Sequence, residues 1–196
     1  MKHAAPTSYA QIAVLALIPA ISFIVGAVYQ PNPVPVSVAR KTVNKKNVAD
    51  FILKAPPKPN NVVNATLNDS IRILGADLPR QPLQKGDNLS LTFYFETLKE
   101  MNRDWTVFVH IDAQGNRFRI HGDHPPAKGR LQTSMWAKGQ LIRDDLQISV
   151  PLDAVPGSYQ VILGFYIGDE RMRFSGGDSK VHAGENNVIV GNMTVR

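Results

Sequence analysis

The chain has 196 residues, of which 43% are hydrophobic and 19% charged, a balance typical of a protein that folds around a core. It contains no cysteine, which excludes disulfide bonds, thiolate metal sites and a cysteine nucleophile. The net charge of +6 comes from residues before the predicted domain, since residues 61–196 hold equal numbers of basic and acidic residues. A nucleic-acid-binding domain carries its positive charge on the folded face, so we expect no nucleic-acid partner.

A membrane span is predicted near the N-terminus. After a polar tail at residues 1–8, residues 9–29 carry no charge and match the roughly 20 residues that a helix needs to cross a bilayer. Tyr9 and Tyr29 stand at its ends, where the membrane interfaces favour tyrosine, and Pro19 kinks such a helix but is tolerated in membrane spans. The alternatives are a cleaved signal peptide and a buried helix of a soluble protein.

Residues 30–60 are predicted to form a linker rich in proline and lysine. Prolines at positions 31, 33 and 35 favour a stiff, extended spacer. Val48, Phe51 and Ile52 follow at helical spacing, so a two-turn helix could lie on the membrane or dock on a partner; a solvated linker is the alternative. Lipid headgroups are the partners expected for the basic residues nearest the span, which are Arg40, Lys41, Lys45 and Lys46.

The orientation of the span rests on opposing signals. By the positive-inside rule alone, the linker charges favour a cytoplasmic C-terminal domain. These charges begin beyond a proline spacer, however, and a short N-terminal tail commonly stays inside when the first helix is an uncleaved signal. We therefore expect a single-pass protein of the bacterial inner membrane with its C-terminal domain in the periplasm.

Residues 61–196 are predicted to form an all-β, immunoglobulin-like antiparallel β-sandwich. Short apolar runs recur between turn signals, with no helical periodicity of any length. In the second run, residues 88–97, Leu89, Leu91, Phe93 and Phe95 share one face. The expected strands cover residues 71–74, 88–97, 105–112, 117–121, 141–150, 158–167, 171–174 and 188–195.

The hairpin from Trp105 to His121 is the centre of this prediction. Its first strand directs Trp105, Val107, Val109 and Ile111 to one face and the residues between them to the other. Gly115 or Asn116 supplies the turn. We expect the ladder to end at residues 122–126, because proline has no N–H to donate. Further on, Tyr159 enters a strand after a predicted corner between the two sheets, at residues 152–159.

Five segments together resemble a known module. They are VHIDAQGN at 109–116, HGDHPP at 121–126, GRLQTSMW at 129–136, KGQLIRD at 138–144 and PLDAVPGSYQVILGFY at 151–166. This pattern resembles the β-sandwich domain that follows the transmembrane bundle in bacterial membrane glycosyltransferases of the dolichyl-phosphate-mannose/arabinosyl transferase type. There the module is a non-catalytic, extracytoplasmic appendage. The resemblance implies a fold and a side of the membrane but no activity, since this chain has one predicted span and lacks the catalytic membrane part.

Side chains that could bind a metal ion lie close together at the end of the hairpin. His121, Asp123 and His124, with His110 on the partner strand, are weak candidates for a metal site. The alternative is that Asp123 and His124 bind the loop backbone, and we expect no metal and no cofactor.

No catalytic motif is present, and we expect no enzyme. The carboxylate pairs Asp144-Asp145 and Asp169-Glu170 point to opposite faces of their strands and are interpreted as solvated edge charges.

Trp136 could stack on a sugar ring, although core packing is favoured.

Two hypotheses about function follow from the predicted span, linker and sandwich. The first hypothesis is a non-enzymatic accessory or scaffolding subunit that binds an integral membrane protein complex through its helix and sandwich. That complex could be a glycosyltransferase or a respiratory or photosynthetic assembly. The alternative is a periplasmic carbohydrate- or glycolipid-binding module in envelope synthesis.

Overall fold

The computed structural model describes residues 48–184 and 186–196. The predicted span with Tyr9, Pro19 and Tyr29 lies outside the described residues, as do the basic residues Arg40, Lys41, Lys45 and Lys46. Among the residues that are described, no helix has the length and apolar character that crossing a membrane requires.

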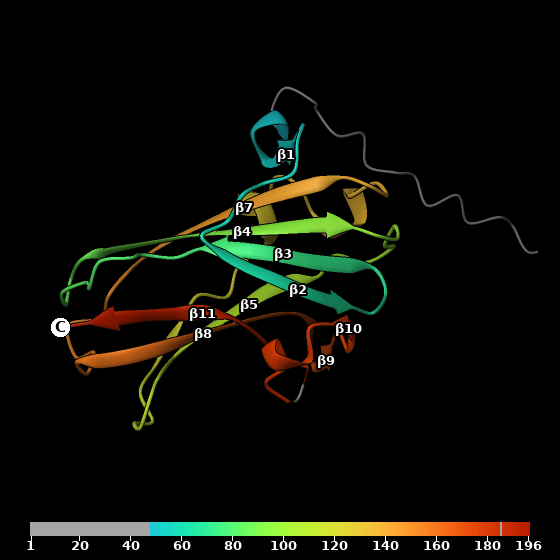
Figure 1. Ribbon diagram of the computed structural model, residues 1–196. Coiled ribbons are helices and arrows are strands. Elements are labelled where there is room, and N and C mark those ends of the chain that lie inside the picture. The colour runs from blue at the N-terminus through green and yellow to red at the C-terminus, as the bar shows by residue number, and fades with distance from the viewer. Residues whose placement is uncertain (1–47, 185) are drawn as a thin grey trace, which may run out of the picture. The chain divides into compact units, whose positions relative to one another are not determined.

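Two antiparallel sheets make up the domain (Figure 1). Sheet A has six strands, in the order β1 (Ile52–Leu53), β7 (Leu141–Ser149), β4 (Asn88–Thr97), β3 (Ile71–Asp77), β2 (Asn61–Leu67) and β10 (Phe174–Gly177). Sheet B contains β11 (Val188–Val195), β8 (Gly157–Ile167), β5 (Thr106–Ala113) and β6 (Arg119–His121), with β9 (Glu170–Arg171) paired to β8. Helical structure in the described part of the chain is limited to short turns: η1 (Ala49–Phe51), η2 (Pro126–Gly129), η3 (Thr133–Met135) and η4 (Ser179–Val181). The predicted antiparallel all-β sandwich is confirmed.

Alternating side chains of both sheets fill the space between them. On β4, Leu89, Leu91, Phe93 and Phe95 are at most 1% exposed, as their period of two predicts. Phe95 meets Phe165 of β8 edge to face, with ring centroids 5.2 Å apart. Each such fully buried side chain contributes about 1.5–3 kcal/mol to folding, and this burial holds the two sheets together.

Strand β5 is covered on both of its faces. Val107, Val109 and Ile111 are fully buried in the core, as predicted. On the opposite face Phe108 is 2% exposed and His110 9%. Phe108 lies directly over Gly164 of β8, where a Cβ atom would clash with the ring. The outer face of β5 around Phe108 and His110 is therefore covered by side chains rather than solvated.

The domain begins before residue 61, where the sequence analysis placed its start. Val48 and Phe51 are 3% and 6% exposed and belong to the hydrophobic core. Strand β1 pairs with β7, placing Ile52 opposite Ile142. The predicted two-turn helix is a single turn here, η1, and this part of the predicted linker packs on the sandwich.

Other strands also differ from prediction. Strand β2 was not predicted, although Val63, Ala65 and Leu67 alternate as its buried face. The expected strand at residues 171–174 is divided between β9 in sheet B and β10 in sheet A. The chain crosses from sheet B to sheet A between β9 and β10. The alternation of apolar residues in a sequence does not reveal such a crossing.

The β5–β6 ladder continues further than predicted. After the His110–His121 pair, the Gly122 amide donates to the Val109 carbonyl at 2.8 Å, and Val107 and His124 exchange two backbone hydrogen bonds of 3.0 and 2.9 Å. The proline argument holds only from Pro125 onward, because both residues before it keep their N–H groups. Residues 121–124 therefore keep the alternation of a strand.

Candidate functional site

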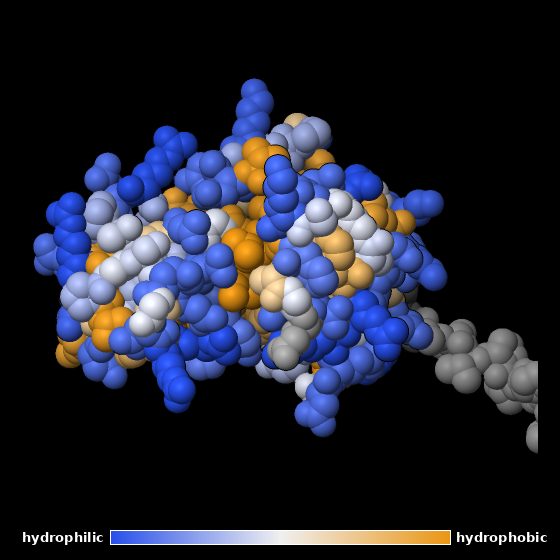
Figure 2. Space-filling view, turned by 60° about the horizontal axis from the view of Figure 1, so that its bottom comes forward, coloured by the Kyte–Doolittle hydropathy of each residue, from blue (hydrophilic) through white to orange (hydrophobic). Residues whose placement is uncertain are grey.

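A hollow of about 310 Å³ lies on the outer face of sheet B. Strands β5 and β8, the β8–β9 turn, β9 and the segment after β6 supply its walls. We call it the sheet-B hollow; it is lined by Phe108, His110, Asp123, Tyr166, Gly168, Asp169 and Arg171. Figure 2, which brings the lower side of Figure 1 forward, shows hydrophobic surface near the centre with hydrophilic side chains on both sides of it. The residues that line the hollow combine the rings of Phe108 and Tyr166 with charged side chains, and such a mixed lining suits a polar ligand that also has an apolar face.

A cross-strand cluster stands at one wall of the hollow. His110 of β5 lies opposite His121 of β6, and their ring centroids are 5.5 Å apart. Because residues paired across a ladder share a face and alternate residues do too, Asp123 joins them on the outer face. One ligand atom from each of His110, His121 and Asp123 lies within 4.8 Å of the other two. This trio is the candidate metal-binding set of the described chain.

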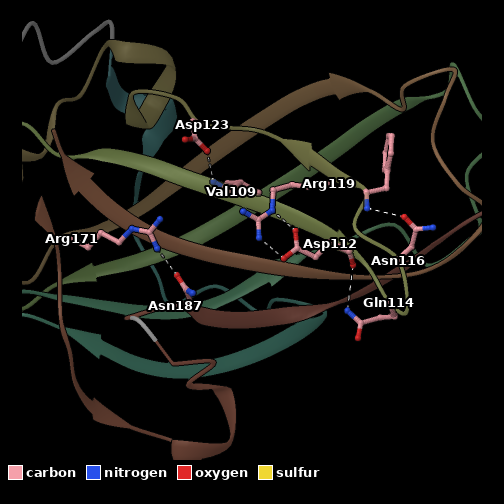
Figure 3. Close-up of polar contacts among 9 residues, drawn as sticks. Val109, Asp112, Gln114, Asn116, Arg119, Asp123, Arg171 and Asn187 are labelled. Carbon is pink, nitrogen blue, oxygen red and sulfur yellow. Dashed lines mark hydrogen bonds and ion pairs between the residues drawn. The ribbon is translucent and has the colours of Figure 1, made fainter. Parts of the chain in front are cut away.

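The Asp123 carboxylate is fixed by two contacts. Its Oδ1 accepts a hydrogen bond of 3.1 Å from the Val109 backbone amide (Figure 3). The Tyr166 hydroxyl donates a second hydrogen bond to the carboxylate. Burial, and then the charge and hydrogen bond of Asp123, raise the pKa of Tyr166. The tyrosine therefore stays a donor at neutral pH.

His110 is held in its neutral form. Burial lowers the pKa of His110, and the positive charges of Arg119 and His121 lower it further, against the opposing effect of Asp123 and Asp112. Arg119 itself is engaged elsewhere, because its Nε and Nη2 donate to both carboxylate oxygens of Asp112 at 2.5 and 2.7 Å (Figure 3). A neutral imidazole offers one free ring nitrogen as an acceptor or metal ligand.

Arg171 covers the aromatic floor of the hollow. Its guanidinium carbon lies 4.7 Å from the centroid of the Phe108 ring, a cation–π contact. The guanidinium also donates to Asn187 Oδ1 at 3.1 Å (Figure 3). With Asp169 it continues into a second hollow of about 500 Å³ that Asn68, Glu170, Arg173 and Asn186 complete. The two hollows share Asp169 and Arg171, so they adjoin.

His124 does not join the candidate cluster. Its Nε2 lies 2.8 Å from Asp144 Oδ2 and its Nδ1 lies 2.6 Å from the Gly122 carbonyl oxygen. Burial opposes a charge on His124, but the hydrogen bond and charge of Asp144, together with the Gly122 carbonyl, raise its pKa. The predicted trio of His121, Asp123 and His124 is therefore not assembled. The third residue beside His121 and Asp123 is His110.

Asp144 also departs from its expected role. Its side chain is 0% exposed, and besides His124 it accepts a 2.8 Å hydrogen bond from the Ala127 amide. The interpretation as a solvated edge charge is wrong for Asp144. It holds for the neighbouring Asp145, which lies on the opposite face and accepts from Thr92 and Arg143.

Trp136 lies in the core. It is 1% exposed, its Nε1 donates to the Leu131 carbonyl at 2.9 Å, and its ring stacks on Phe95 with centroids 5.8 Å apart. Phe165 meets it edge-on. Both faces of the indole are thus unavailable to a sugar, so a glycan-binding role for Trp136 does not fit this structure.

Sequence reasoning overlooked three residues of the hollow. Tyr166 and Arg171 were placed only within strands, and Phe108 only on the outer face of β5. The alternation of β8 is the signal that could have found Tyr166, because Tyr166 pairs with Thr106 and shares the outer face with the even-numbered residues of β5. Arg171 gave no such signal, since β9 has only two residues.

The sequence matches no protein-family model and no curated protein. Two solved structures align with part of this chain. The C-terminal domain of Wzt is 10% identical with a TM-score of 0.45, over 71% of this chain and 82% of that one. A family 123 glycoside hydrolase from Clostridium perfringens is 12% identical with a TM-score of 0.34, over 68% of this chain and 26% of that one. These similarities are too low to assign a ligand or an activity to this chain.

Proposed function

We propose that this protein is a non-catalytic carbohydrate-binding module and that the sheet-B hollow is its binding surface. The observation that carries the proposal is the hollow itself. Its volume of about 310 Å³ is near the lower end of the range for small-molecule sites, roughly 300–1,000 Å³. Its walls combine aromatic rings with hydrogen-bonding side chains, and this combination fits a saccharide better than an apolar ligand.

The side chains of the hollow match what a sugar requires. Hydroxyl groups of a sugar both donate and accept hydrogen bonds, and the carboxylates of Asp123 and Asp169 accept them while the Arg171 guanidinium donates. Tyr166 is partly exposed and offers an aromatic ring for the apolar face of a sugar. The adjoining hollow beyond Arg171 provides room for a second residue of an oligosaccharide.

The module is proposed to belong to the immunoglobulin-like sandwiches. At the corner before β8, the Tyr159 hydroxyl donates to the Val155 carbonyl at 2.6 Å, four residues upstream. A tyrosine with this backbone contact is a feature of such sandwiches at the corner between their sheets. It supports the predicted topology and gives the corner residues 152–159 a structural role.

The cellular setting is proposed from the sequence. A span at residues 9–29 and a stiff spacer would tether the module on the periplasmic side of the bacterial inner membrane. The resemblance to the appended module of membrane glycosyltransferases supports this side of the membrane. The same tether and the neutral charge of residues 61–196 favour a second function, an accessory subunit that presents the sandwich to a membrane complex.

Glycan binding is tested with the full chain in detergent, with EDTA present, against a panel of bacterial envelope oligosaccharides. We expect binding that Tyr166→Ala weakens at least tenfold, since it removes the ring and the hydroxyl from the hollow. Tyr94→Ala is the matched control, because Tyr94 lies on the outer face of sheet A and also donates to a carboxylate, that of Asp77. Equal binding by both variants, or no binding by the unmodified chain, would overturn the proposal.

A further inference from the structure

We infer that His110, His121 and Asp123 form a binding site for one divalent transition-metal ion, with Zn²⁺ the best match. The inference goes beyond the proposed carbohydrate binding and stands without it. It rests on three ligand atoms that converge from two paired strands onto one patch of the outer face of sheet B.

The distances are compatible with one ion. Zn²⁺ binds histidine nitrogen and carboxylate oxygen at about 2.0–2.2 Å, so neighbouring ligands of a tetrahedral ion stand about 3.4 Å apart. The ligand atoms of the trio all lie within 4.8 Å of one another. Closing the remaining gap takes a side-chain shift of about an ångström. His121 and Asp123 are exposed and can make this shift by rotation, while the buried His110 stays in place.

The kinds of ligand select the kind of metal. Two imidazole nitrogens and one carboxylate oxygen suit Zn²⁺ and other transition metals, whereas Ca²⁺ and Mg²⁺ prefer oxygen ligands throughout. Three protein ligands leave at least one coordination position for water or an incoming group. Because His110 and Asp123 also line the sheet-B hollow, that position would face the hollow.

The surroundings of the trio already resemble a second coordination sphere. Asp123 accepts from the Val109 amide and from Tyr166, and such contacts orient a ligating carboxylate. The nearby Arg119 donates two hydrogen bonds to Asp112, so its guanidinium is held by that carboxylate and not by Asp123. Both histidines lie in a register fixed by the β5–β6 ladder. The ligands are therefore held close to their binding positions before the metal arrives.

The test is a titration of the full chain, purified in detergent and freed of metal with EDTA, with ZnCl₂ by calorimetry and with CoCl₂ by visible absorption. We expect one ion per chain, a cobalt spectrum of low coordination number, and a rise in Tm. His121→Gln should weaken binding at least tenfold, and His121→Gln with Asp123→Asn should abolish it. His182→Gln is the control, since His182 stacks on Phe174 away from the trio.

Two results would overturn the inference. One is zinc binding by the His121→Gln/Asp123→Asn variant as tight as that of the unmodified chain, provided that both have the same metal-free Tm. The other is a failure of the unmodified chain to bind zinc. Glycan binding in EDTA is scored separately. A chain that binds glycan but no zinc refutes only the metal site, and one that binds zinc but no glycan refutes only the carbohydrate proposal.

Discussion

At the scale of single residues, the most consequential group is Asp144. Its carboxylate is completely buried and depends on His124 and the Ala127 amide. Removing one partner of a buried ion pair leaves the other charge uncompensated, which costs about 3–5 kcal/mol. We expect Asp144→Ala to lower the free energy of unfolding by about that amount, measured by urea denaturation.

The adjacent carboxylate is the control for this prediction. Asp145 differs from Asp144 by one position in the chain but lies on the solvent side of β7, with 26% of its side chain exposed. Exposed ion pairs contribute about 0–1 kcal/mol, so Asp145→Ala should have a small effect. Equal losses for the two variants would contradict the assignment of the buried pair.

The same pair makes stability depend on pH. The pKa of His124 in the folded protein is raised above its unfolded value of about 6.5, because the hydrogen bond to Asp144 and its charge outweigh the effect of burial. A raised pKa stabilises the fold fully below about pH 6.5 and loses that contribution as pH rises through the folded-state value. Urea midpoints measured in EDTA should therefore fall with rising pH in this window.

Substitution isolates His124 as the source of that slope. His110 titrates below the window, because its folded-state pKa is lowered. In His124→Gln the midpoint should be nearly independent of pH above about 6.5, the unfolded histidine value. A slope that survives the substitution would assign the pH dependence to another group.

Gly164 is the residue on which the floor of the sheet-B hollow depends. A Cβ at this position would clash with the Phe108 ring, so Gly164→Ala displaces the ring beneath Arg171. Overpacking of this kind costs about 1–3 kcal/mol. We expect such a loss in urea denaturation, together with weaker glycan binding. Gly176→Ala is the matched control, because nothing lies within 4 Å of its Cβ position.

At the scale of elements, η1 and β1 are predicted to be part of the folding unit. Phe51 is 6% exposed against the core, and truncating a buried phenylalanine costs about 3–5 kcal/mol. Phe51→Ala in a chain of residues 48–196 should lose about that much. Leu152→Ala, at a residue 79% exposed, should change stability by less than about 0.5 kcal/mol. If Phe51→Ala lowers the free energy of unfolding as little as Leu152→Ala does, η1 and β1 belong to the linker and not to the folding unit.

Long strands with an apolar face of large side chains could be predicted from the sequence, and shorter or less apolar strands could not. The strands β4 and β11 have the predicted bounds. In β4, every second residue is buried along the whole strand, which makes its period of two easy to recognise. Strand β1 has only two residues, too few to show a period. Strand β2 does alternate, with Val63, Ala65 and Leu67 buried, but this short, partly small apolar face was missed in the sequence. Strand β1 is held by β7, a partner distant in the chain, whereas β2 pairs with the neighbouring strand β3.

The candidate site was predicted in part, and a single boundary explains the error. Ending the hairpin at Gly122 left the directions of the next residues undetermined, so His124 was grouped with His121 and Asp123. Carried on to His124, the alternation places His121 and Asp123 outside and His124 inside, toward Asp144. The burial of Asp144 had no such signal, because it depends on a histidine that comes from the other sheet.

At the scale of the whole molecule, the remaining question is which side of the membrane the sandwich occupies. The absence of cysteine allows a direct answer, because any introduced thiol is the only one in the chain. Asn116 lies exposed in the β5–β6 turn, and Ser8 lies in the tail before the predicted span. In spheroplasts, a membrane-impermeant maleimide should label Asn116→Cys at once and Ser8→Cys only after detergent is added. The reverse pattern would place the sandwich in the cytoplasm, as the linker charges alone favour, and would separate it from the periplasmic glycans that its hollow is proposed to bind.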